Sequence, residues 1–99
     1  MTYRPLPNYL TIKESEIEGL GLYSTESLIH GSYLGISHVA NDRFENGYIR
    51  TPLGGFINHS EDPNCEVRED VDGNLMLFTL RQISSNEELT LKYNLYKVH

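Results

Sequence analysis

Apolar and polar residues alternate over short stretches of this chain, a pattern typical of half-buried β-strands. Strands are expected at residues 9–13, 21–24, 33–39, 65–68, 75–80 and 88–93. Short helical pieces are expected only at 25–28 and 56–59. Asp72 and Gly73 lie between two of the strands and suit a tight hairpin turn, because both residue types tolerate positive φ. The pattern predicts a mostly-β domain of several small sheets.

Length and composition limit what this domain can be. Its 99 residues are expected to form a single domain, 1–99, because a shorter piece could not bury a core of its own. No apolar run approaches the roughly 20 residues that a membrane span needs, and the first ten residues do not form a secretory signal. We therefore expect an intracellular protein of the cytoplasm, or of the host nucleus if the source is a eukaryotic virus.

Cysteine and histidine give no sign of a metal centre. The chain has a single cysteine, Cys65, which excludes an internal disulfide and a multi-cysteine zinc site. Its four histidines, His30, His38, His59 and His99, show no metal-ligand spacing. We expect no bound metal.

The formal net charge of −6 argues against direct nucleic-acid binding, which needs a basic surface. It is compatible with a basic partner such as a lysine-rich peptide, which an acidic surface attracts. The charge alone equally fits a protein that is simply kept soluble, so it does not choose between these interpretations.

Three clusters carry candidate chemistry. Residues 18–23 (EGLGLY) contain a G-x-G that fits either a turn needing positive φ or a backbone open to a ligand. Residues 56–64 (FINHSEDPN) fit either a self-bonded polar loop or a site that offers amide and imidazole groups to a planar ligand. Residues 87–96 (EELTLKYNLY) end an alternating strand in tyrosines, which most often pack with the hydroxyl in water.

Taken together and in this order, the clusters resemble the SET domain of protein-lysine methyltransferases. Residues 18–23 resemble the G-x-G-L-F motif that opens the domain, and 28–35 resemble the segment that follows it. Residues 56–64 match F-I-N-H-S-x-x-P-N at every fixed position, and 87–93 resemble the closing E-E-L-T-x-x-Y motif. The similarity runs from about residue 12 to residue 96. It implies a fold of small sheets with a C-terminal pseudoknot, in which the last segment threads under the loop near the N-H-S motif.

The resemblance also implies a cofactor, S-adenosyl-L-methionine (SAM), and a protein substrate whose lysine enters a narrow channel from the opposite face. The backbone of Gly19, Leu20 and Gly21 would hold the methionine part of SAM. Asn58 and the backbone of His59 would hold its adenine and amino-acid ends. The family pattern also gives His59 a structural role, in which its hydrogen bonds fix the crossing of the chain.

The tyrosines take the remaining family roles. Tyr93 aligns with the catalytic tyrosine, whose hydroxyl orients the methyl group and the lysine nitrogen. Tyr33 aligns with a residue that lines the lysine channel, and Leu91 and Tyr96 are expected to add to that wall. Tyr48 is a further candidate, although the segment before it diverges from the family.

Several positions depart from the family pattern. Gly55 replaces a common Arg, Glu61 a frequent Cys, and Asn86 the usual Gly before Glu-Glu. Leu91-Lys92 stands where Tyr or Phe followed by Asp is common. Because a Leu leaves more room than an aromatic hydroxyl, Leu91 predicts that more than one methyl group can be added.

The domain is also compact. It lacks the cysteine-rich flanks that complete the channel with zinc in many chromatin enzymes, and the insertion between Gly35 and Tyr48 is short. In this it resembles the stand-alone SET proteins of viruses and bacteria. The missing channel wall is expected to come from Tyr96 and its neighbours, from the bound peptide or from a second subunit. A homodimer would also cover the apolar surface that the missing flanks leave.

Three other functions are considered. The first is a SET-like domain that has lost catalysis and binds a protein partner, and SAM binding would discriminate against it. The second is a methyltransferase acting on small molecules or nucleic acid, which the acidic charge and the absence of a Rossmann-like pattern disfavour. The third is a structural β-domain without a ligand, which four motifs in register disfavour.

Overall fold

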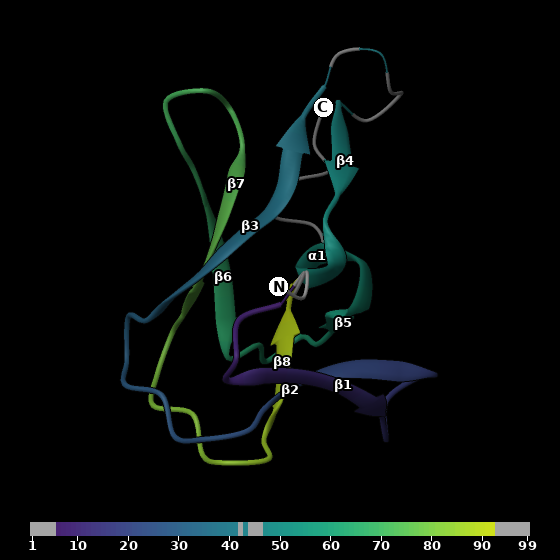
Figure 1. The fold of residues 1–99 in the computed structure, drawn as a ribbon, viewed down its shortest axis with the longest axis vertical. Coiled ribbons are helices and arrows are strands. Elements are labelled where there is room, and N and C mark those ends of the chain that lie inside the picture. Colours follow the sequence, from purple (N-terminus) through teal and green to yellow (C-terminus); the bar gives the residue numbers. More distant parts are fainter. Residues whose placement is uncertain (1–5, 42, 44–46, 93–99) are drawn as a thin grey trace, which may run out of the picture.

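The computed structural model describes residues 6–41, 43 and 47–92. Their strands form two four-stranded sheets, ordered β1-β2-β8-β5 and β4-β3-β7-β6, with one short helix, α1 (Figure 1). The elements in chain order are β1 Leu10–Glu14, β2 Leu20–Ser24, β3 Tyr33–Ala40, β4 Tyr48–Arg50, α1 Pro52–Phe56, β5 Asn58–His59, β6 Cys65–Glu69, β7 Leu75–Thr79 and β8 Glu88–Leu91.

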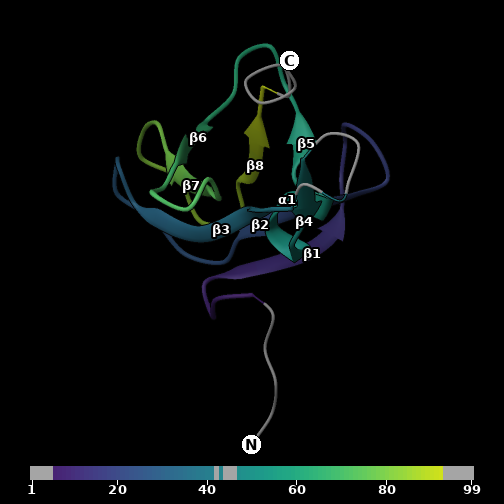
Figure 2. The same ribbon diagram turned by 90° about the horizontal axis from the view of Figure 1, so that it is seen from above.

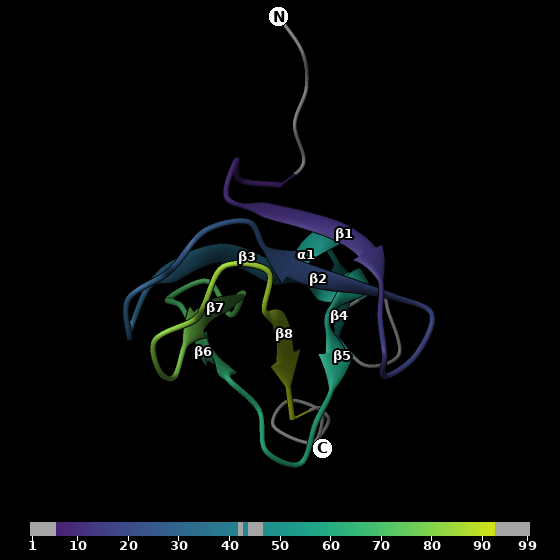
Figure 3. The same ribbon diagram turned by 90° about the horizontal axis from the view of Figure 1, so that it is seen from below.

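Strand β8 lies in the middle of the molecule, between the β6–β7 hairpin and β5 (Figures 2 and 3). It pairs antiparallel with β2 and parallel with β5, where Asn58 lies opposite Thr90 and His59 opposite Leu91. A parallel pair requires a long connection between its strands, and here residues 60–87, which include β6 and β7, supply it. The E-E-L-T segment in β8 therefore lies directly beside Asn58 and His59 of the F-I-N-H-S-x-x-P-N motif.

The mostly-β prediction is confirmed, and each expected strand is present with its ends shifted by only a residue or two. The hairpin around Asp72 and Gly73 is also confirmed, although only Gly73 has positive φ, at 86°. The Asp70 carboxylate holds the turn by accepting hydrogen bonds from the amides of Asp72 and Asn74, at 2.8 and 2.9 Å.

The helix expected at 25–28 is absent, and of the one expected at 56–59 only Phe56 is helical, as the last residue of α1. Asn58 and His59, expected to be helical, form β5, because their backbones pair with β8. In the segment 25–28, also expected to be helical, Leu28 instead forms an isolated β-bridge with Ile83. The two residues exchange backbone hydrogen bonds of 2.9 and 2.8 Å. The helix that does form, α1, begins one residue after Thr51 with a proline, a residue whose fixed φ suits a first helical turn. Strand β4 was not predicted.

One core joins the two sheets and α1. Its members are aliphatic side chains and the thiol of Cys65, all less than a tenth exposed: Leu10, Leu22, Leu34, Leu53, Ile57, Cys65, Leu77, Ile83, Leu89 and Leu91. Burial raises the pKa of the Cys65 thiol to about 12, so it stays protonated and packs as a small apolar group. Among the described residues, no helix has the length and apolarity to cross a membrane.

His38 is a buried histidine in β3, and it predicts a pH-dependent stability. Burial, with a smaller contribution from the Arg50 charge, lowers its pKa from 6.5 to about 4. The unfolded chain therefore takes up this proton at a higher pH than the folded one. Above about pH 7 His38 is neutral in both states, so it gives the stability no pH dependence there. As the pH falls from 6.5 towards 4, the free energy of unfolding should drop by about 3 kcal/mol.

Urea unfolding at a series of pH values measures this effect. In a His38→Gln variant the slope between pH 6.5 and pH 4.5 should become shallower than in the wild type, whatever the variant's absolute stability. Equal slopes in the two proteins would contradict the prediction.

Candidate functional site

The loop between β1 and β2 is folded around one serine. The Ser15 amide donates a hydrogen bond to the Gly19 carbonyl at 2.8 Å. The Ser15 hydroxyl oxygen accepts hydrogen bonds from the amides of Ile17 and Glu18, at 2.8 and 3.3 Å. Residues 15–19, called the hairpin loop below, are therefore shaped largely by a residue that sequence reasoning did not single out.

The two glycines of the G-x-G serve different purposes. Gly19 has φ of +49°, and a Cβ there would have no heavy atom within 4 Å, so its backbone faces open space. A Cβ on Gly21 would lie 2.3 Å from Oε2 of Glu88, so this glycine makes room for that carboxylate. The turn interpretation is confirmed at Gly19, which has positive φ. The interpretation of the motif as a backbone open to a ligand stays a prediction.

Asn58 connects the second cluster to the first. Its Nδ2 lies within hydrogen-bonding distance of four oxygens: Ser15 Oγ at 3.0 Å, Glu18 O at 3.1 Å, Leu20 O at 3.3 Å and Glu88 Oε2 at 2.9 Å. An amide group has only two N–H donors, so these oxygens outnumber the hydrogens available to them. The side chain that was expected to bind the cofactor thus holds the hairpin loop against β5 and β8.

His59 faces a neighbouring carboxylate. Its Nε2 lies 2.8 Å from Oε2 of Glu61, and Lys92 Nζ lies 3.7 Å from the other oxygen of the same group. The hydrogen bond with His59, followed by the Lys92 charge, lowers the pKa of Glu61. With the bond from the Ser60 amide to the Leu91 carbonyl, at 3.1 Å, these contacts tie the N-H-S segment to the end of β8.

Two of the expected channel residues, Tyr33 and Tyr48, lie at opposite ends of β3. Tyr33 begins β3 and is half-exposed, with its ring 5.3 Å from that of Phe78. Tyr48 pairs with Ala40 at the other end of β3, about 20 Å away along the strand, and its ring meets His38 edge-on at 5.9 Å. The two tyrosines are thus not neighbours along this eight-residue strand, and the channel that they were expected to line stays a prediction.

Leu91 is fully buried in the core, and the Leu91 carbonyl accepts the bond from Ser60. Its effect on the number of methyl groups therefore stays a prediction. Tyr93 and Tyr96 lie outside the described residues, and their roles stay predictions as well.

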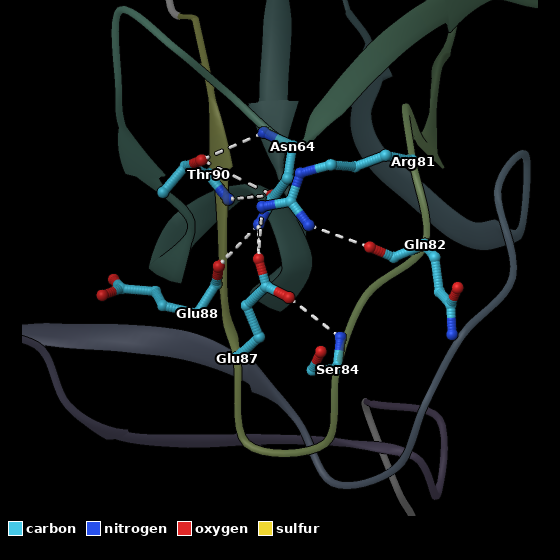
Figure 4. A network of polar contacts seen from close by, with 7 residues as sticks. All are labelled: Asn64, Arg81, Gln82, Ser84, Glu87, Glu88 and Thr90. Carbon is cyan, nitrogen blue, oxygen red and sulfur yellow. Dashed lines mark hydrogen bonds and ion pairs between the residues drawn. The ribbon is translucent and has the colours of Figure 1, made fainter.

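A second polar network holds the other side of β8 (Figure 4). The buried Asn64, last residue of the F-I-N-H-S-x-x-P-N motif, donates from Nδ2 to the Glu88 carbonyl at 2.8 Å and to the Glu87 carboxylate at 3.2 Å. Its Oδ1 accepts from the Thr90 amide at 2.8 Å. The Glu87 carboxylate is also paired with Arg81, which lowers the pKa of Glu87.

Sequence reasoning missed Ser15 entirely and did not assign a role to Glu88. Glu88 could have been found, because it belongs to the E-E-L-T motif. Nothing in the local sequence marks Ser15. Its side-chain partners outside the loop lie 43 residues away at Asn58 and 73 residues away at Glu88, so only the fold reveals them.

A model of the SET domain family matches residues 8–94. The chain belongs to the SET domain family. Over 75 residues, or 73% of its length, it is 33% identical to a Gibberella zeae protein named "Histone-lysine N-methyltransferase, H3 lysine-36 specific", of which it covers 8%. The chain spans a tenth or less of the length of each of the curated relatives that it matches.

Two solved structures share the fold. One is that of a candidate histone methyltransferase from Plasmodium falciparum, with a TM-score of 0.68 and 22% identity over 89% of this chain and 95% of that one. The other is the methyltransferase domain of human PR domain-containing protein 2, with a TM-score of 0.67 and 16% identity over 87% of this chain and 77% of that one. These similarities confirm the SET-type arrangement of small sheets. The threading of the C-terminal segment falls on residues 93–99, outside the described part of the chain.

Proposed function

We propose that this SET domain transfers methyl groups from SAM to the side-chain amine of a lysine in a protein substrate. The observation that carries the proposal is the parallel pairing of β5 with β8. Through this pairing the Asn58 side chain contacts the hairpin loop. His59 lies opposite Leu91, which precedes Tyr93 by two residues in the sequence. Three motifs that are far apart in sequence thus meet at one place.

The residues around the hairpin loop fit SAM as the cofactor. When bound, SAM supplies a methyl group on a positively charged sulfonium. The backbone at Gly19 is open on the side where a Cβ would project, so a ligand can approach it closely. The carbonyls of Glu18 and Leu20 and the Glu88 carboxylate add negative potential that suits a cationic ligand.

The chemistry needs little from the protein beyond positioning. A free lysine has a pKa of about 10.4, so making its amine neutral at pH 7 costs roughly 4.6 kcal/mol. Desolvation in an apolar channel lowers that pKa and recovers part of the cost. Aromatic faces can receive the lysine cation as it enters, and alignment of the neutral nitrogen then completes the requirement. In this scheme the Tyr93 hydroxyl orients the nitrogen.

A histone tail or another basic protein is the proposed substrate class, because the chain carries a net charge of −6. The name of the Gibberella zeae relative refers to histone H3, which agrees with this class. The relatives of this chain that carry that name are fungal. The likeness to the compact SET proteins of viruses and bacteria therefore remains a prediction. Homodimer formation, cytoplasmic or host-nuclear location, and the absence of a bound metal are also predictions.

Transfer of labelled methyl from SAM tests the proposal. Histones and ribosomal proteins are incubated in parallel with the wild type and with Tyr93→Phe, and mass spectrometry locates the label. We expect label on lysine, and a rate lower by about tenfold or more in the variant, because a positioned hydroxyl is lost. A wild type that neither labels protein nor binds SAM in calorimetry would instead support a protein-binding module without catalysis.

A further inference from the structure

Glu88, the first residue of β8, sits beneath the hairpin loop. The Ser15 hydroxyl donates to its carboxylate, with Oγ 2.9 and 2.8 Å from the two oxygens. Asn58 Nδ2 donates to the same carboxylate at 2.9 Å. Figure 4 shows that this side chain points away from the network of Arg81 and Glu87, so two adjacent glutamates serve separate parts of the domain.

The contact with Glu88 fixes the direction in which Ser15 bonds. A serine hydroxyl has one proton and two lone pairs. Because the proton is given to the Glu88 carboxylate, the two lone pairs are left to accept from the neighbouring N–H groups, which are the amides of Ile17 and Glu18 and Asn58 Nδ2. A charged acceptor makes this hydrogen bond stronger than one between neutral groups. The carboxylate therefore orients the hydroxyl around which the hairpin loop folds.

Gly21 shows how closely this carboxylate is packed. A Cβ at this position would lie 2.3 Å from Glu88 Oε2 and 3.0 Å from the Ser15 Cβ. The second glycine of the G-x-G thus admits Glu88 to its place under the loop. Its contribution to a cofactor site is indirect.

We propose that Glu88 is a positioning residue of the cofactor site, acting through Ser15 and Asn58 to hold the hairpin loop in the conformation that binds SAM. This inference rests on the proposed function, because it assumes that the loop contacts SAM. It assigns the carboxylate to cofactor affinity and leaves the methyl-transfer step to other residues.

Calorimetry with S-adenosyl-L-homocysteine (SAH) tests the inference on the full chain. Glu88→Gln keeps the shape of the side chain but removes the charge and one of the two acceptor oxygens. We expect the Kd for SAH and the KM for SAM to rise about tenfold, the loss of a charge-assisted bond, with kcat changed much less. Glu87→Gln is the matched control, because the Glu87 carboxylate contacts Arg81, Ser84 and Asn64. Its Kd should stay within about twofold of the wild type.

Hydrogen exchange without ligand supplies a second readout. The amides of Ile17 and Glu18 should exchange faster in Glu88→Gln, whereas Glu87→Gln should leave their relative protection unchanged. Ser15→Ala removes the other end of the contact and should raise the Kd in the same direction. It provides the test if Glu88→Gln does not fold.

Each result has a distinct meaning. Weakened SAH binding in Glu88→Gln or Ser15→Ala, with normal binding in Glu87→Gln, supports the inference. Normal binding in the two loop-contact variants, or weakening in all three in proportion to lost stability, overturns it and leaves the proposed function intact. A wild type that binds no SAH overturns both.

Discussion

Replacing Gly54 by alanine should lower the free energy of unfolding by about 3 kcal/mol, at the upper end of what overpacking costs. Gly54 lies in α1, and a Cβ there would come within 2.2 Å of the Ser37 carbonyl oxygen and 3.0 Å of the His38 ring. The nearest atom belongs to the backbone of β3, which cannot turn aside as a flexible side chain could.

The helix has little freedom to relieve this clash. Thr51, the residue before α1, donates from its amide to the Ser37 carbonyl at 3.0 Å and from its hydroxyl to the Ile36 carbonyl at 2.7 Å. Moving α1 away from β3 would stretch these bonds. The better helix propensity of alanine, worth about 1 kcal/mol, offsets only part of the cost.

Gly55 provides the matched control, one residue further along α1. It is exposed, and a Cβ there would meet no heavy atom within 4 Å. Gly55→Ala should therefore be neutral or stabilise the protein by up to about 1 kcal/mol. Urea unfolding of both variants measures the difference. Equal stabilities would show that α1 packs against β3 less closely than the structure indicates.

Replacing Asn64 by alanine should cost a similar amount, about 3 kcal/mol. The side chain is 4% exposed and holds β8 through the Thr90 amide and the Glu88 carbonyl, both at 2.8 Å. Alanine removes these partners and also the donor to the Glu87 carboxylate. Buried polar groups that lose a partner in this way cost roughly 1–3 kcal/mol each.

Chemical denaturation measures this loss, with Asn41→Ala as the control. Asn41 accepts a hydrogen bond from the Arg43 amide in an exposed turn, at 2.9 Å, so its replacement should change the stability by less than about 0.5 kcal/mol. A loss of under 1 kcal/mol in Asn64→Ala would mean that water or a neighbouring side chain replaces the amide.

The six longer strands were predictable because their signal is local. Alternation of apolar and polar residues reports that one face of a segment is buried, and it does so wherever its partners lie. The same holds for the turn at Gly73, because a glycine has no Cβ and so tolerates the positive φ of this turn. The helix expected at 56–59 failed because β5 is only two residues long, too short for any period to appear.

The candidate site was predictable only in part. The motifs identified the family, and through it Asn58, His59 and the G-x-G as a group. They did not show that Asn58 bonds the hairpin loop itself, nor that Gly21 makes room for Glu88. Tyr33 was assigned to the channel by alignment with the family and Tyr48 only as a further candidate, and strand pairing places the two at opposite ends of β3.

The sequence by itself determined the class of fold, the family and the segments that carry its motifs, because periodicity, turn residues and motif spacing are written along the chain. Only the tertiary structure decided which side chains meet. Asn58, Ser15 and Glu88 come from three segments up to 73 residues apart. Their contacts depend on strand order and register, which arise from burying the whole core at once and leave no mark on any one segment.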